Sequence, residues 1–84
     1  MSGFDDSQLD LVQAALRATI DLREELGRRG AEATLCAAAA SSAGNPALAA
    51  GYSALTDALS MAEREVAALV CEHTATVQRL GGTT

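Results

Sequence analysis

The sequence contains no lysine and no tryptophan, and it has one residue each of proline, phenylalanine and tyrosine. All six basic residues are arginine, against eleven Asp and Glu, so the net charge is −5. Because a phosphate backbone requires a basic surface, this balance argues against a nucleic-acid partner. It also argues against a basic helix lying on a membrane surface.

Cysteines and long apolar runs are also scarce. Cys36 and Cys71 have no CxxC spacing and no companion His or Cys cluster, so we expect free thiols and no metal or other cofactor. No stretch approaches the roughly 18 apolar residues of a membrane span. The acidic start, Met1–Asp10, lacks the positive charge and apolar run of a secretory signal, which predicts synthesis in the cytoplasm.

At 84 residues the chain is expected to form one domain. Hydrophobic residues make up 49% of it, but many are alanine, which favours helix and buries little area. Short domains with such a thin core usually need external support. Two cysteines supply at most one bridge, so a partner chain is the expected support.

The second half of the chain carries an unbroken apolar pattern with alternating steps of four and three residues. Such spacing averages 3.5 residues, and a helix that keeps it buries the stripe against other helices. Val70 and Val77 widen the stripe. The members of the pattern are Leu48, Tyr52, Leu55, Leu59, Ala62, Val66, Leu69, His73, Thr76 and Leu80.

A first helix is predicted from about 7 to 42, with Ser7 and Asp10 as a capping box. Glu24–Arg28 and Glu25–Arg29 are spaced as favourable ion pairs on its polar, solvated face. Its apolar face is wider than one neighbouring helix can cover. That face comprises Leu9, Val12, Leu16, Thr19, Leu22 and Leu26, flanked by Leu11 and Ile20.

Gly27 and Gly30 leave two readings open for this helix. Either it continues, with Gly30 allowing another helix to approach closely, or it kinks and restarts at Ala31. The small apolar residues that follow favour continuation. If the chain instead folds back here, it forms three helices.

The clear break is a turn at 43–46. Gly44 or Asn45 suits the left-handed end of one helix, and Asn45 and Pro46 suit the start of the next. Because the connection is short, the second helix, about 46–80, should run antiparallel to the first. Residues 81–84 form the expected C-terminal tail.

No group of residues predicts catalysis, so we expect that the chain is not an enzyme. Glu63, Glu65 and Glu72 are expected to face solvent. His73 is expected to be a half-buried packing residue, and Tyr52 to pack with its hydroxyl at the rim, although Tyr52 would also suit a partner anchor.

The predicted fold is therefore an all-α antiparallel hairpin that pairs with another hairpin, as a homodimer or a heterodimer, into a four-helix bundle. The expected partner interface comprises Leu9, Val12, Leu16, Ile20, Leu26, Leu48, Tyr52, Leu55, Leu59, Val66, Leu69, Val70, His73, Val77 and Leu80.

The segment Gly-Asn-Pro-Ala-Leu-Ala-Ala-Gly-Tyr at 44–52 is similar to one in EspC-like type VII (ESX) secretion targets. There a Gly-x-Pro-x-Leu-Ala-Ala run followed by an aromatic residue opens the second helix. The acidic start, tight turn and long second helix also resemble the WXG superfamily of actinobacterial secretion proteins. The resemblance implies a non-enzymatic partner or targeting adaptor of a secretion substrate, exported as a complex.

Two family features are missing from this chain. Gly44-Asn45-Pro46 stands in place of the Trp-x-Gly turn, and no Tyr followed four residues later by Asp or Glu lies past the second helix. The chain therefore resembles the signal-lacking member of a pair. The alternative is a homodimeric bundle with a structural or regulatory role unrelated to secretion.

Overall fold

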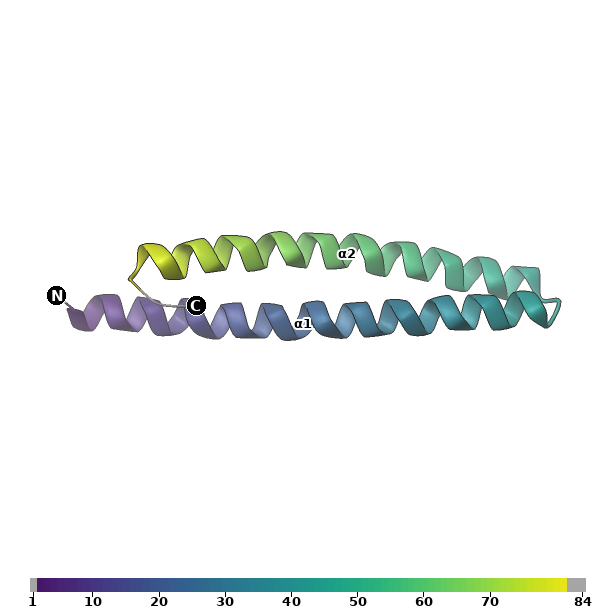
Figure 1. Ribbon diagram of the computed structural model, residues 1–84, viewed down its shortest axis with the longest axis horizontal. Helices are drawn as coiled ribbons and strands as arrows, with labels where there is room; N and C mark the ends of the chain where they lie inside the picture. Colours follow the sequence, from purple (N-terminus) through teal and green to yellow (C-terminus); the bar gives the residue numbers. More distant parts are fainter. Residues whose placement is uncertain (1, 82–84) are drawn as a thin grey trace. The chain divides into compact units, whose positions relative to one another are not determined.

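The computed structural model describes residues 2–81, and side chains from residue 7 onward. The regular elements in this range are two helices, α1 at Ser2–Ser42 and α2 at Pro46–Arg79 (Figure 1). This confirms the predicted all-α helical hairpin. Residues 82–84, and with them most of the expected tail, lie outside the described range.

The predicted start of the first helix is wrong, because α1 begins at Ser2 and Ser7 lies inside it. No proline precedes Pro46, and no positive φ precedes Gly44 among the described residues, so nothing in the backbone stops the helix earlier. Acidic residues near the N-terminus of a helix stabilise it through the helix dipole. The capping box at Ser7 and Asp10 is therefore not formed.

The end of α1 is set by Gly44, whose φ of 76° lies in the left-handed region. The amide of Gly44 donates to Ser41 O at 3.0 Å, and the amide of Asn45 donates to Ala40 O at 2.9 Å. These two bonds form the Schellman arrangement, which satisfies carbonyls at a helix end. Gly44 is thus the residue that takes the predicted left-handed conformation.

The start of α2 is capped by Asn45, as predicted. Its side-chain Oδ1 accepts a hydrogen bond from the amide of Leu48 at 3.1 Å. Pro46 is the first residue of α2, where its fixed φ fits and its missing N–H is not needed. One asparagine therefore joins the end of one helix to the beginning of the next.

Both glycines in the middle of α1 lie in an uninterrupted helix, which confirms continuation and excludes the kinked alternative. A Cβ on Gly30 would lie 4.0 Å from the Cβ of Leu59, so α2 passes close to this point. A Cβ on Gly27 would lie 3.4 Å from Oε2 of Glu63. The glycines thus permit a close approach between the two helices.

The helices contribute to two compact units. Unit 2 is Glu24–Arg64, which contains the turn and the parts of both helices beside it. Unit 1 joins the part of α1 up to Arg23 with the part of α2 from Glu65 onward.

In unit 2 the two helices face each other with stripes of buried or half-buried residues, here called the inner stripe. Ala33 and Ala40 are its buried members. Thr56 fits there because its hydroxyl donates to Tyr52 O at 3.0 Å, within the helix. The stripe consists of Leu26, Gly30, Ala33, Ala37 and Ala40 on α1, and Ala49, Tyr52, Thr56, Leu59 and Glu63 on α2.

Unit 1 has an inner stripe of the same periodicity but with larger side chains. Val77 is fully buried, at 0% exposure, and Val66 is buried. The half-buried His73 matches its predicted role as a packing residue. The stripe consists of Leu9, Val12, Leu16 and Thr19 on α1, and Val66, Val70, His73, Val77 and Leu80 on α2.

Within a single chain the apolar pattern of α2 does not pack as one stripe. Tyr52, Leu59, Val66, His73 and Leu80 belong to the inner stripe, but the alternate members Leu48, Leu55 and Leu69 are exposed. The residues one position later, Ala49, Thr56 and Val70, lie on the inner stripes instead. The small residues of α1 bring the helices of unit 2 close together, and such spacing suits Ala49 and Thr56 better than leucine.

Candidate protein-interaction surface

A row of leucines on α2 remains exposed beside the inner stripe, and we call it the leucine row. Leu48, Leu55 and Leu69 are 49%, 46% and 44% exposed, and half-buried Ala62 occupies the heptad position between the last two. Residues seven apart lie on the same face of a helix. Leu48 and Leu55 belong to unit 2 and Leu69 to unit 1, and exposed apolar side chains on one face of a helix are typical of interaction sites.

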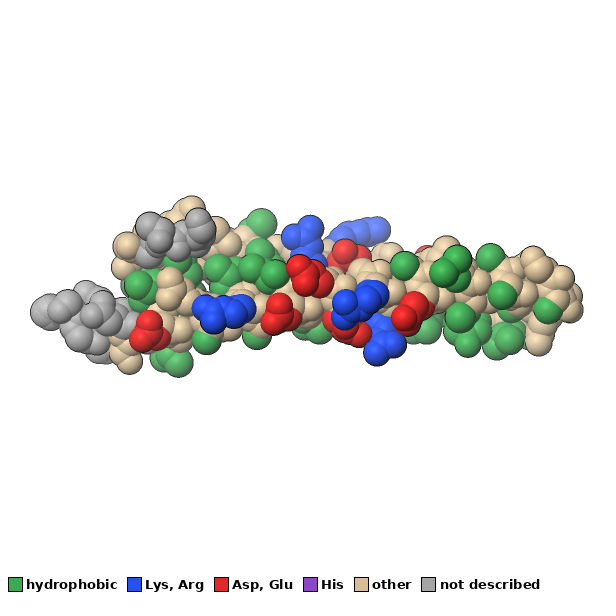
Figure 2. Space-filling view, turned by 60° about the horizontal axis from the view of Figure 1, so that its bottom comes forward, with side chains coloured by type: hydrophobic (Ala, Val, Ile, Leu, Met, Phe, Trp, Pro, Cys, Tyr) green, Lys and Arg blue, Asp and Glu red, His purple; other side chains and the backbone are tan. Residues whose placement is uncertain are grey.

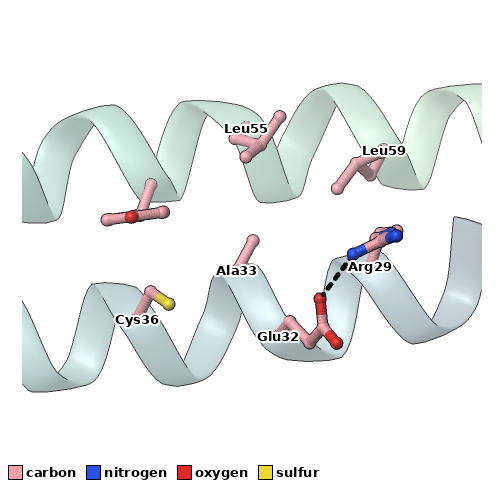
Figure 3. A pocket seen from close by; sticks show the side chains of 7 residues that line it. Arg29, Glu32, Ala33, Cys36, Leu55 and Leu59 are labelled. Atoms are coloured by element: carbon pink, nitrogen blue, oxygen red, sulfur yellow. Dashed lines mark hydrogen bonds and ion pairs between the residues drawn. The ribbon is translucent and has the colours of Figure 1, made fainter.

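In unit 2 the leucine row borders a groove between the helices (Figure 3). Leu55 and Leu59 extend from α2, and Ala33 and Cys36 lie opposite on α1. Tyr52 also lines the groove, and Arg29 and Glu32 complete its lining. The wall is therefore mostly apolar, with its charged residues confined to α1.

The charged residues of the groove are already bonded along α1. Nε of Arg29 donates to Glu25 at 2.8 Å, and another Arg29 nitrogen donates to Glu32 at 3.3 Å. Arg28 also pairs with Glu25. The predicted Glu25–Arg29 pair is thus confirmed, whereas Arg28 pairs with Glu25 and not with Glu24.

These ion pairs are largely exposed, with the Arg29 side chain at 61%. Exposed pairs within a helix contribute about 0.3–0.5 kcal/mol each to stability. The carboxylates bonded to Arg29 offset its charge, so the groove carries no excess positive charge. Its recognition chemistry is that of apolar side chains.

The residues predicted as a partner interface fall into three groups in the single chain. Two are buried within it, Val66 and Val77. Four are exposed, namely Ile20, Leu48, Leu55 and Leu69. Nine are half-buried on the inner stripes, namely Leu9, Val12, Leu16, Leu26, Tyr52, Leu59, Val70, His73 and Leu80.

One expectation about the polar residues of α2 is wrong. Glu63 does not face solvent freely but is half-buried, with a carboxylate oxygen beside Gly27. The glycine leaves the space that this side chain occupies. Glu65 and Glu72 are exposed, as predicted.

The apolar stripe predicted from the sequence includes Ala33, but the groove itself, the position of Cys36 in it and several exposed apolar residues were not predicted. Ala33 and Cys36 line the groove, while Leu35 and Met61 are 71% and 60% exposed on other faces. One signal in the sequence could have directed attention here. Residues 33–56 contain no Asp, Glu, Lys, Arg or His, and this segment includes most of the groove.

Cys36 and Cys71 are free and exposed. Among the described residues, no group of three or more His, Cys, Asp or Glu is placed to hold a metal ion. Neither α1 nor α2, over the range described, has the length and apolar character needed to cross a membrane.

Comparison of the chain with protein-family models, curated proteins and solved structures finds no match.

Proposed function

We propose that this chain is a non-enzymatic helix-pairing protein that joins a second helical hairpin in a four-helix bundle. The leucine row is the observation that carries the proposal, because a hairpin alone leaves these side chains about half exposed. A second hairpin laid along the row would bury them. Burying apolar area contributes about 25 cal/mol per Å².

The biological role that we propose is partner or targeting adaptor of a type VII secretion substrate, with export as a complex. Support comes from the similarity of segment 44–52 to EspC-like secretion targets. In that segment Gly44 takes the left-handed conformation that follows the end of α1. Asn45 caps α2, and Leu48 is the first member of the leucine row. Each of these motif residues thus has a defined structural role in this chain.

Co-purification tests the pairing. The chain is tagged and co-expressed with helical-hairpin proteins encoded by adjacent genes, and recovery of a stable complex is the expected result. Changing Leu48, Leu55 and Leu69 together to serine should abolish the complex. Met61→Ser removes a comparably exposed apolar side chain outside the leucine row and should leave the complex intact. Equal recovery with all variants would contradict pairing through this row.

Secretion requires a separate measurement. Deleting the gene should reduce the amount of a type VII substrate in the culture medium, and the wild-type gene should restore it. Unchanged export would contradict the adaptor role. A homodimeric bundle unrelated to secretion, the second candidate, would then be favoured if the purified chain pairs with itself.

A further inference from the structure

Charge is distributed unevenly in unit 2. The segment without charged residues, 33–56, surrounds the turn, and the charged residues of the unit lie in 24–32 and 57–64. The turn end of unit 2 accordingly shows only uncharged surface in the view of Figure 2. Two copies of a chain with net charge −5 repel one another in general, but this segment contributes nothing to that repulsion.

The two walls of the groove in unit 2 also differ in size. In its half nearer the turn the α1 wall offers the small side chains Ala33 and Cys36, and Ala43 follows Cys36 after seven residues, whereas Arg29 and Glu32 line the other half of this wall. The α2 wall offers Leu55, and Leu48 precedes it by seven residues. In the half of the groove nearer the turn, small side chains on α1 therefore lie across from large ones on α2, and such a surface is complementary to a copy of itself turned about a two-fold axis.

We propose that this groove binds the same groove of a second copy, with the turns of both copies at the same end. The α2 helix of each copy then packs on the α1 helix of the other. Gly30 lies opposite Leu59. Four residues nearer the turn on each helix, Leu55 therefore lies at the level of Thr34. That level lies between Arg29 and Cys36, so Leu55 of each copy enters the groove of the other.

The same-end orientation follows from the charges. If the second copy were turned end over end, its charged residues at 24–32 and 57–64 would cover the uncharged segment of the first and lose water without partners there. With the turns together, the uncharged segment 33–56 of one copy lies at the level of the same segment of the other. The inference rests on the helix pairing that the proposed function describes. It takes the homodimer, the second candidate there, as the form of that pairing and specifies the surface and the direction.

Two substitutions test the surface by sedimentation of the full chain over a range of concentrations. Leu55→Glu places a charge in the interface, and Cys36→Phe fills the groove from its small-residue wall. Each should weaken the dimer by about tenfold or more while the helical circular dichroism of the chain remains, because both residues are exposed in the single chain. Met61→Glu, on another face and 60% exposed, should leave the dimer unchanged.

Cross-linking tests the direction. With Cys71→Ser, a short bis-maleimide should join Cys36 of the two copies, which lie at one level and within about 15 Å when neighbouring helices are 8–10 Å apart. As the control, both natural cysteines are changed to serine and Ser53→Cys is introduced. Ser53 is exposed and flanks the inner stripe on the side away from Leu55, so it should not cross-link.

The outcomes separate this inference from the proposed function. A dimer that cross-links through the introduced residue 53 thiol and not through Cys36 would overturn the surface assigned here and leave pairing itself intact. A chain that stays monomeric alone yet co-purifies with a different hairpin would overturn the second copy as partner. A chain that pairs with neither would refute both proposals.

Discussion

Glycine has opposite roles at two positions of unit 2. Gly44 takes a φ of 76°, which an L side chain adopts only with strain, and it has open space around it. Gly27 has ordinary helical backbone and leaves room beside Glu63, where an added Cβ would be at van der Waals distance. At Gly44 the backbone requires glycine, whereas at Gly27 it does not.

These roles predict opposite effects of the same substitution. Gly44→Ala should destabilise the hairpin by about 1–2 kcal/mol, the cost of the left-handed region for an L residue. Gly27→Ala should stabilise it by about 0.5–1 kcal/mol, because glycine weakens a helix interior. Thermal unfolding followed by circular dichroism measures both. Destabilisation by Gly27→Ala would mean that Glu63 cannot shift from the glycine.

Asn45 predicts a third effect at the residue scale. Asn45→Ala removes the side-chain acceptor of the Leu48 amide and should cost about 1 kcal/mol of stability. Ser42→Ala changes an exposed neighbour just before the turn and should have little effect. Equal losses in urea unfolding would indicate that the turn backbone, and not the cap, sets the stability there.

At the scale of the element, the apolar pattern of α2 shares every second member, such as Tyr52 and Leu59, with the inner stripes, while its other members form the leucine row. The sequence predicted the helix, its cap and the members Tyr52 and Leu59 correctly, because periodicity and capping are local properties. It did not distinguish the row that holds Leu48 from the row that holds Ala49. That choice depends on the small residues of α1, which are distant in sequence and decide how close the helices come.

The choice of row can be tested by truncating one member of each. Val77 is fully buried, and Val77→Ala should lower the free energy of unfolding by about 2 kcal/mol through lost burial and a residual cavity. Leu69 is 44% exposed, and Leu69→Ala in a helix should cost less than about 1 kcal/mol. Urea midpoints at one low protein concentration provide the comparison. The reverse ranking would show that the helices pack through the leucine row.

At the scale of the whole molecule, the negative net charge and the exposed leucines have opposite effects on association. The net charge of −5 keeps copies apart, while the leucine row and the groove of unit 2 favour association through apolar contact. Ion pairs contribute little to such an interface, because those near the groove are formed along α1 itself. Association should therefore be limited by repulsion between the charged parts of the copies.

For the proposed pairing of two copies, this balance predicts how salt acts on the dissociation constant. Raising NaCl to about 0.5 M shortens the Debye length to a few Å and screens the repulsion between two acidic chains. It does not weaken apolar contact, so the dissociation constant should fall by about two- to tenfold. Sedimentation equilibrium at low and high salt measures the change. The unfolding temperature should rise with protein concentration under both conditions, because pairing stabilises the folded chain. A dimer that dissociates on addition of salt would instead be held together by ion pairs between copies, which the uncharged segment cannot provide.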